Sequence, residues 1–180
     1  MNIHWEKTVQ TSCPREQVYA YLSDFSRHRE WSRTLERMQR IAEGDANGIG
    51  ARYLTHERLE FGPTSGWKRH LNVMKTARTQ CEVRDLQPGE RIEWHARPVP
   101  SLGGWANLTL DFQDLDGGGT LIRQQVTEHY PRPVALVLRT ALNVTEDGIR
   151  GQLDRTLDIL CARLDELHAA QDQMGIAAGS

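Results

Sequence analysis

Two glutamates, Glu57 and Glu128, lie at positions where the alternation of apolar and polar residues predicts the buried face of a β-strand. A carboxylate on such a face must be paired, hydrated or shifted in pKa, because burying it without a partner is very costly. Two carboxylates on this face indicate a cavity that contains water or a ligand rather than a solid core. In such a cavity the two carboxylates could transfer protons to and from a ligand. The alternative for each glutamate is a strand end in solvent or an ion pair with a nearby arginine.

Signatures of metal, nucleotide and nucleophile chemistry are missing from the sequence. It has no His-Glu-x-x-His, no phosphate-binding glycine loop and no Gly-x-Ser-x-Gly motif. The seven histidines show no helical pairing of the kind that holds a metal, and His56 and His95 fall on the charged face of the predicted sheet. We therefore expect no metal and no cofactor.

Periodicity predicts the elements that must position the two glutamates. Residues 3–12 alternate as a first strand, and the helical spacing that follows predicts a helix over 14–25 and a second helical turn over 28–31. The period then becomes two, which predicts strands at 36–43, 50–61, 76–87, 91–98, 104–115 and 119–130. Their short connections cannot make parallel crossovers, so we expect an antiparallel sheet.

A long helix is predicted after Pro133, ending at about His168, with a leucine stripe that would cover the dry face of the sheet. Gly148 and Gly151 lie inside this segment. They mark either a kink or break between two helices, or missing side chains that leave room for a ligand beneath the helix. Both interpretations stay open at this point.

The composition indicates an ordinary globular domain. With 180 residues, 38% of them hydrophobic and 26% charged, the chain suits a single domain over 1–170 followed by a flexible tail over 171–180. A net charge of −2 and few aromatics on the charged sheet face argue against nucleic acid as a partner. Three scattered cysteines, no signal peptide and no long apolar run predict a cytoplasmic protein without membrane insertion.

The motifs follow one another in a recognisable order. After the first strand come Pro-x-x-x-Val-x-x-x-Leu-Ser-Asp (14–24), His-Arg-Glu-Trp (28–31), Gly-Ile-Gly-Ala-Arg-Tyr (48–53), Val-Arg-Asp-Leu-Gln-Pro-Gly-Glu-Arg-Ile-Glu-Trp (83–94) and Gly-Gly-Gly-Thr (117–120). In this order they resemble the polyketide cyclase/dehydrase branch of the START-like (SRPBCC, Bet v 1-like) superfamily across nearly the whole chain. The resemblance implies an α+β helix-grip fold: a curved antiparallel sheet of roughly seven strands around a long C-terminal helix, two short helices after the first strand, and a deep cavity for an apolar or aromatic ligand.

The segment 62–75 departs from the family pattern, because it is longer than the simple hairpin expected there. It would extend two strands or form a flap over the mouth of the cavity. Trp67 and Arg69 would then contact the ligand. Alternatively, Trp67 only anchors the tip of the hairpin.

The resemblance also implies proton transfer around a carbonyl group. Glu57 and Glu128 are the candidate acid and base. Tyr53 and Tyr130 would donate hydrogen bonds to a carbonyl oxygen. Of these two tyrosines, Tyr53 is counted as the third candidate catalytic residue. The remaining candidate ligand contacts are Trp31, Trp67, Arg69, Cys81, Trp94, Trp105, Gln124, Tyr130, Gly148 and Gly151, although each tryptophan could instead belong to the core.

The expected ligand is a small hydrophobic or aromatic, polyketide-like molecule, and the expected protein is a cyclase or dehydratase that is monomeric or homodimeric. The alternative is a non-catalytic carrier of a lipid, an isoprenoid or a quinone, because the same fold does both.

Overall fold

Seven strands form one antiparallel sheet in the computed structural model, which describes residues 1–58, 76–100, 102–140 and 144–178. The strands are β1 (Asn2–Thr11), β2 (Leu35–Ala42), β3 (Arg52–Arg58), β4 (Thr76–Gln87), β5 (Arg91–Pro98), β6 (Trp105–Asp114) and β7 (Thr120–His129). They lie in the order β1-β7-β6-β5-β4-β3-β2, so β1 returns to pair with the last strand while the others pair with their neighbours in sequence. The predicted antiparallel sheet is confirmed.

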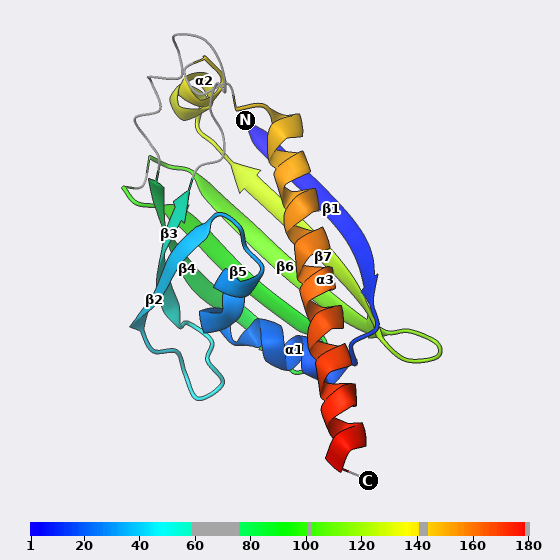
Figure 1. Ribbon diagram of the computed structural model, residues 1–180. Coiled ribbons are helices and arrows are strands. Elements are labelled where there is room, and N and C mark those ends of the chain that lie inside the picture. Colours follow the sequence, from blue (N-terminus) through cyan, green and yellow to red (C-terminus); the bar gives the residue numbers. More distant parts are fainter. Residues whose placement is uncertain (59–75, 101, 141–143, 179–180) are drawn as a thin grey trace.

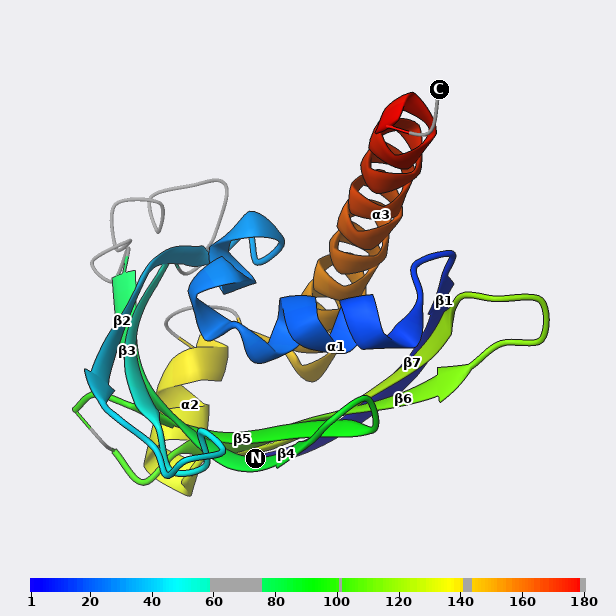
Figure 2. The same ribbon diagram turned by 90° about the horizontal axis from the view of Figure 1, so that it is seen from below.

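The described residues also form four helical segments. They are α1 (Arg15–Ser23), the short 3-10 helix η1 (Phe25–Glu30), α2 (Arg132–Thr140) and α3 (Glu146–Ala178). Figure 2 shows the sheet as a curved wall, with α1 and α3 crossing the side toward which it bends. The α+β helix-grip fold that the sequence implied is therefore confirmed.

The hydrophobic core lies between the concave face and α3. The members that are almost inaccessible to solvent are Ile92, Leu110, Ile122 and Val126 from the sheet and Leu157, Leu160 and Leu164 from α3. Full burial of each such side chain is worth about 1.5–3 kcal/mol. Their alternation on the strands and their spacing on the helix are the patterns from which the sequence predicted this packing.

Polar contacts fix α3 against β1. The Asp165 Oδ1 atom accepts hydrogen bonds from the Thr11 hydroxyl at 2.7 Å and from the backbone N–H and hydroxyl of Ser12, each at 2.8 Å. Lys7 forms an ion pair with Asp158 at 2.7 Å. The long helix therefore crosses the sheet near β1 and β7 (Figure 1).

The single long helix expected after Pro133 is divided into α2 and α3. The Thr145 hydroxyl accepts the backbone N–H of Gly148 at 3.1 Å, which is the geometry of a helix N-cap and explains why α3 begins at Glu146. At its other end α3 is helical through Ala178, so the prediction that the helix ends at about His168 is wrong. The segment has alanine, glutamine and methionine, which favour helix without any apolar periodicity.

Candidate functional site

Glu57 and Glu128 both lie on the concave face of the sheet. Glu128 on β7 is paired with Ile3 of β1 and Ala106 of β6, and Glu57 on β3 is paired with Leu35 of β2. Three strands separate β3 from β7 in the sheet. The negative charge of Glu57 nevertheless raises the pKa of Glu128, so the curved sheet brings the two carboxyl groups within electrostatic reach of each other.

The Glu128 carboxyl forms a pair with Tyr130. The tyrosine hydroxyl donates to Glu128 Oε2 at 2.7 Å. Burial is the largest cause that raises the pKa of Glu128, with the charge of Glu57 acting in the same direction and the hydrogen bond from Tyr130 opposing them. Burial and the neighbouring Glu128 also raise the pKa of Tyr130, so the phenol keeps its proton.

Glu57 is held by a hydroxyl from its own strand. Its Oε1 atom lies 2.7 Å from the Thr55 hydroxyl, which also lies 3.1 Å from the backbone carbonyl oxygen of Thr79 on β4. Thr55 is buried, and it occupies the same face as Glu57 because the two residues are separated by one period of the strand. These contacts orient the Glu57 carboxyl toward β4.

Small side chains form the part of the concave face between the two glutamates. Cys81 on β4 is paired with Ala96 on β5, and Ala96 with Ala106 on β6, which in turn neighbours Glu128. Burial, together with the charge of Glu57, raises the pKa of Cys81 to about 12, so its thiol is protonated. Small residues therefore follow one another across three strands of the concave face.

The exposure of the concave face changes along the strands. Val83, Leu110 and Ile122 are almost completely inaccessible, whereas Glu128 and Tyr130 keep some accessible surface. Both of these are nevertheless surrounded closely enough for burial to dominate their pKa. Glu128 and Tyr130 thus combine some accessible surface with dense surroundings.

A packed aromatic cluster contains three of the candidate residues. The Phe25 ring stacks on Tyr53 at 5.1 Å and meets Trp94 edge-on at 5.7 Å, and His28 lies 5.0 Å from Trp31. All five residues are buried. Trp31, Trp94 and Tyr53 therefore pack in the core, as the alternative interpretation of the tryptophans held, and Tyr53 accepts a hydrogen bond from Arg40 at 2.8 Å instead of facing Glu57 or Glu128.

His28 is the titratable member of this cluster. Its Nε2 atom is hydrogen-bonded to the backbone carbonyl oxygen of Leu22 at 2.9 Å. Burial lowers its pKa to about 4, so the ring is neutral at physiological pH. His28 has a structural role, and the sequence analysis did not single it out.

Trp105 lies on the opposite face of the sheet from the two glutamates. Its ring is stacked between His95 at 6.1 Å and His129 at 5.7 Å, both on the convex side. It therefore does not line the concave face. The alternation of Leu108, Leu110 and Phe112 already placed odd-numbered residues of this strand outward.

The two helical glycines do not leave room beneath α3. A Cβ atom on Gly151 would contact Arg155, which is exposed, and one on Gly148 would contact Thr145 at 3.2 Å. At 100° per residue, both glycines point away from the stripe that contains Leu157 and Leu160. Of the two interpretations, the structure thus supports a break between helices, located just before Gly148.

Of the three further candidates, one is on the concave face and two lie outside the described residues. Gln124 is buried on β7, paired with Lys7 and Leu110, away from the row of small residues. Trp67 and Arg69, with the segment 62–75 that carries them, lie outside the described residues. The sequence analysis did not select Thr55, Ala96 and Ala106, although small residues at inward positions of successive strands were a visible signal.

In the described part of the chain, no three histidine, cysteine, aspartate or glutamate side chains converge as a metal site requires. None of the helices described for this chain combines the length and apolar character needed to cross a membrane.

One known protein family matches most of the chain. The family model described as polyketide cyclase / dehydrase and lipid transport matches residues 2–165. No curated protein matches the chain.

Similar solved structures share the fold. A START superfamily protein from Mycobacterium smegmatis has a TM-score of 0.64 at 12% identity, covering 91% of this chain and 98% of its own. The Zhui aromatase/cyclase from Streptomyces sp. R1128 has a TM-score of 0.64 at 16% identity, covering 92% and 94%. Protein CV1439 from Chromobacterium violaceum has a TM-score of 0.60 at 19% identity, covering 91% and 98%.

Proposed function

The chain belongs to the polyketide cyclase/dehydrase and lipid transport family, and from this premise we propose that it binds a small aromatic, polyketide-like molecule on its concave face and acts on it by acid/base chemistry. Membership of this family and the helix-grip fold both support the binding of a hydrophobic ligand. The proposal adds a reaction and assigns it to Glu128 and Glu57, with Tyr130 as partner.

One observation carries the proposal. Glu128 is a carboxyl group on the concave face whose pKa is raised by burial and by the charge of Glu57, and it lies 2.7 Å from the Tyr130 hydroxyl. A carboxyl group that burial holds toward its protonated form can act as a general acid. Glu128, favoured in its protonated form, is suited to the role of acid, and Glu57 to that of base.

The reaction that fits these roles is loss of water from a β-hydroxy ketone. The Glu57 carboxylate removes a proton from the carbon between the carbonyl and the hydroxyl-bearing carbon, and the freed electron pair forms the new C=C bond. The C–O bond to the hydroxyl group breaks, and the leaving oxygen takes the proton of Glu128, so that water departs. Exchange with solvent returns the proton from Glu57 to Glu128. In cyclisation the freed electron pair would instead form a C–C bond to a second carbonyl carbon of the ligand. The π bond of that carbonyl would break, and its oxygen would take the proton of Glu128.

The test uses a bicyclic β-hydroxy ketone whose loss of water gives a fluorescent naphthol. We expect the wild-type protein to accelerate naphthol formation, and Glu128→Gln or Glu57→Gln to lower that rate by roughly 10²–10⁴-fold, the usual contribution of a general acid or base. Affinity for the product, measured by quenching of tryptophan fluorescence, should stay within a few-fold of wild type. Glu82→Gln, on the convex face where Glu82 pairs with Arg84 at 3.1 Å, is the matched control and should keep full activity.

The carrier interpretation differs in the catalytic readout. The wild-type protein would then not accelerate naphthol formation, while both glutamine variants would bind the ligand as wild type does. Native mass spectrometry of the purified protein identifies any co-purified molecule and so gives the ligand class directly.

A further inference from the structure

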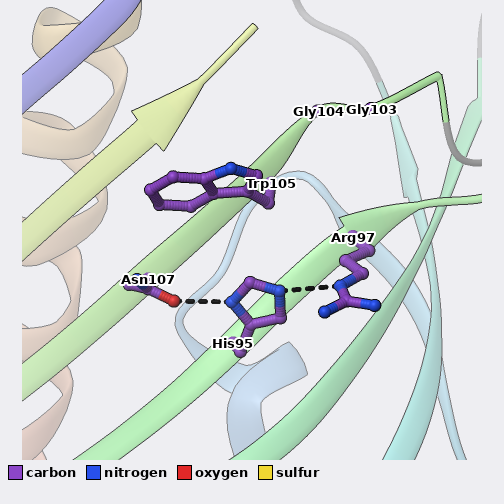
Figure 3. A pocket seen from close by; sticks show the side chains of 6 residues that line it. All are labelled: His95, Arg97, Gly103, Gly104, Trp105 and Asn107. Carbon is purple, nitrogen blue, oxygen red and sulfur yellow. Dashed lines mark hydrogen bonds between the residues drawn. The ribbon is translucent and has the colours of Figure 1, made fainter.

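A depression lies on the convex face of the sheet, on the opposite side from Glu57 and Glu128. It has a volume of about 440 Å³ and is lined by His95 and Arg97 of β5, Trp105 and Asn107 of β6, and the preceding Gly103 and Gly104 (Figure 3). This volume lies within the range of small-molecule sites, about 300–1,000 Å³. We propose that this depression binds a small aromatic carboxylate, with Trp105 contacting the ring and Arg97 holding the carboxylate.

The cation in this site is oriented by its neighbours. The Arg97 Nε–H donates to His95 Nε2 at 2.8 Å, which leaves the Nδ1–H of His95 to donate to Asn107 Oδ1 at 2.6 Å (Figure 3). This chain fixes the guanidinium group on rigid strand residues. Within the described residues, the two terminal amino groups of Arg97 meet no acceptor, so both remain to bind a carboxylate in the two-pronged geometry that guanidinium favours.

The Trp105 indole in this depression is also held in place by its neighbours. The Trp105 ring keeps some accessible surface and is held between His95 and His129 by stacking on either side. His129 is itself fixed by a hydrogen bond to Asn2 at 2.7 Å. An indole held in this way contributes apolar contact without losing side-chain entropy when a ligand binds.

Glycine keeps the rim of the depression low. Gly103 has a φ of +82°, a conformation that other residues rarely adopt, and a Cβ atom there would come within 3.0 Å of Pro131. A Cβ atom on Gly104 would lie 3.4 Å from the carbonyl oxygen of His129. Backbone rather than side chains therefore borders Trp105 on this side.

The charge of this end of the convex face suits an anion. The outward-facing side chains here are basic or neutral: Asn2, His4, Arg78, Gln80, His95, Arg97, Trp105, Asn107, Thr127 and His129. Two carboxylates lie next to this group: Glu82 of β4 is the register partner of His95, and Glu93 is the outward residue before His95 on β5. Glu82 forms an ion pair with Arg84, while Asp111 and Glu6 pair with Arg91 and Arg123. The basic side chains beyond these carboxylates, at the strand ends, favour a higher local concentration of anions.

A smaller depression on the same convex face differs in that its arginine is already paired with a carboxylate. It measures about 230 Å³, and its charged groups, Glu6, Asp111 and Arg123, are already paired with one another or with Arg91. Its arginine has a carboxylate partner, whereas the terminal amino groups of Arg97 have none among the described residues. Arg123 therefore provides a matched control for Arg97.

The test is a titration of the full chain with naphthalene carboxylate, followed by the indole N–H resonances in two-dimensional NMR spectra. We expect a saturable shift of the Trp105 resonance, assigned with Trp105→Phe, while those of the buried Trp31 and Trp94 stay in place. Arg97→Ala should weaken binding about tenfold or more, as loss of a charge-assisted hydrogen-bonded pair does, and Arg123→Ala should leave it unchanged. The uncharged naphthalene carboxamide should bind at least about tenfold more weakly than the carboxylate.

Three results would each overturn the proposal. They are a shift confined to Trp31 or Trp94, equal weakening by Arg97→Ala and Arg123→Ala, and equal affinity for the carboxylate and the carboxamide. Because Arg97 is exposed, its variant should fold, and the dispersion of the same spectra reports this directly. Glu128→Gln, which alters only the concave face, should leave the Trp105 titration as in wild type, so the outcome is independent of the proposed reaction.

Discussion

At the scale of single residues, the fold changes the protonation of Glu128 and His28 in opposite senses. The Glu128 carboxyl is held toward its protonated form by burial and by Glu57. The His28 ring is held neutral by burial within the aromatic cluster. Each shift is also a statement about stability, because a group that titrates differently in the folded and unfolded chains makes stability depend on pH.

Glu128 is expected to lower stability at neutral pH. Its folded-state pKa lies above the unfolded-state value, so the folded protein binds more protons between the two values and stability falls as pH rises through that interval. Glu128→Gln removes this loss while its amide oxygen can still accept from Tyr130. Thermal melting from pH 4 to 9 should show a higher Tm for Glu128→Gln than for wild type at pH 7, with the gain vanishing near pH 4. A lower Tm at every pH would contradict this account.

His28 should make the protein sensitive to acid. Its pKa is about 4 in the folded state against an ordinary 6.5, so the unfolded chain takes up the proton first as pH falls between those values. Stability should drop by roughly 3 kcal/mol across that window. His28→Phe keeps the ring stacked but cannot take up a proton. Urea denaturation at several pH values should show a lower stability for the variant at pH 7 and a smaller loss from pH 6.5 to 4; equal losses would refute the assignment to His28.

At the scale of elements, α3 determines which helical positions can affect the ligand. Its inward stripe packs on the sheet, and Thr145 caps its first turn. Gly151 lies on the far side of the helix, where a Cβ atom would meet only Arg155 at 3.5 Å. Substitution there should act on helix stability alone.

Gly151→Ala should therefore raise the free energy of unfolding by up to about 1 kcal/mol, the difference in helix propensity between the two residues. Ligand affinity should not change, because the new methyl group points away from the sheet. Urea denaturation and a parallel binding titration measure both quantities. Thr145→Ala, which removes the cap, is the contrasting variant and should lower stability by about 1 kcal/mol. Loss of ligand binding in Gly151→Ala would show that the glycine does leave room for the ligand.

At the scale of the whole molecule, the question is whether the sheet and helices enclose free space above the small residues. Ala106 lies in the row between Cys81 and Glu128 and is only partly buried. Ala51, by contrast, is buried in the packed cluster with Val83. Substituting these two alanines therefore compares the proposed recess with a filled core in the same protein.

Ala106→Leu should abolish ligand binding without lowering stability, because the added carbons would fill the recess. Ala51→Leu should lower stability by about 1–3 kcal/mol, the usual cost of overpacking a core. Urea denaturation of both variants, together with binding of the naphthol product, distinguishes the two cases. If Ala106→Leu is destabilised as strongly as Ala51→Leu, the concave face is packed solid and the proposed function fails.

The sequence by itself determined the local part of this structure. The side-chain period of a strand is two, so alternation alone placed Glu57 and Glu128 on the inward face and predicted each strand to within a few residues where the structure describes it. The family resemblance supplied the helix-grip fold. The outward position of Trp105 was available from the same alternation, and its assignment to the ligand site ignored that signal.

Only the tertiary structure decided which residues meet. Glu57 and Glu128 influence each other across three intervening strands because the sheet bends, and that bend depends on pairing between residues far apart in the chain. The same is true of the aromatic cluster around Phe25. There Tyr53 stacks on Phe25 and accepts a hydrogen bond from Arg40, so it does not contact the two carboxyl groups. The convex depression at Trp105 also arises from register, since β5, β6 and β7 set His95 and His129 on either side of the indole. Periodicity is a local property of the chain, whereas these contacts follow from strand order and curvature.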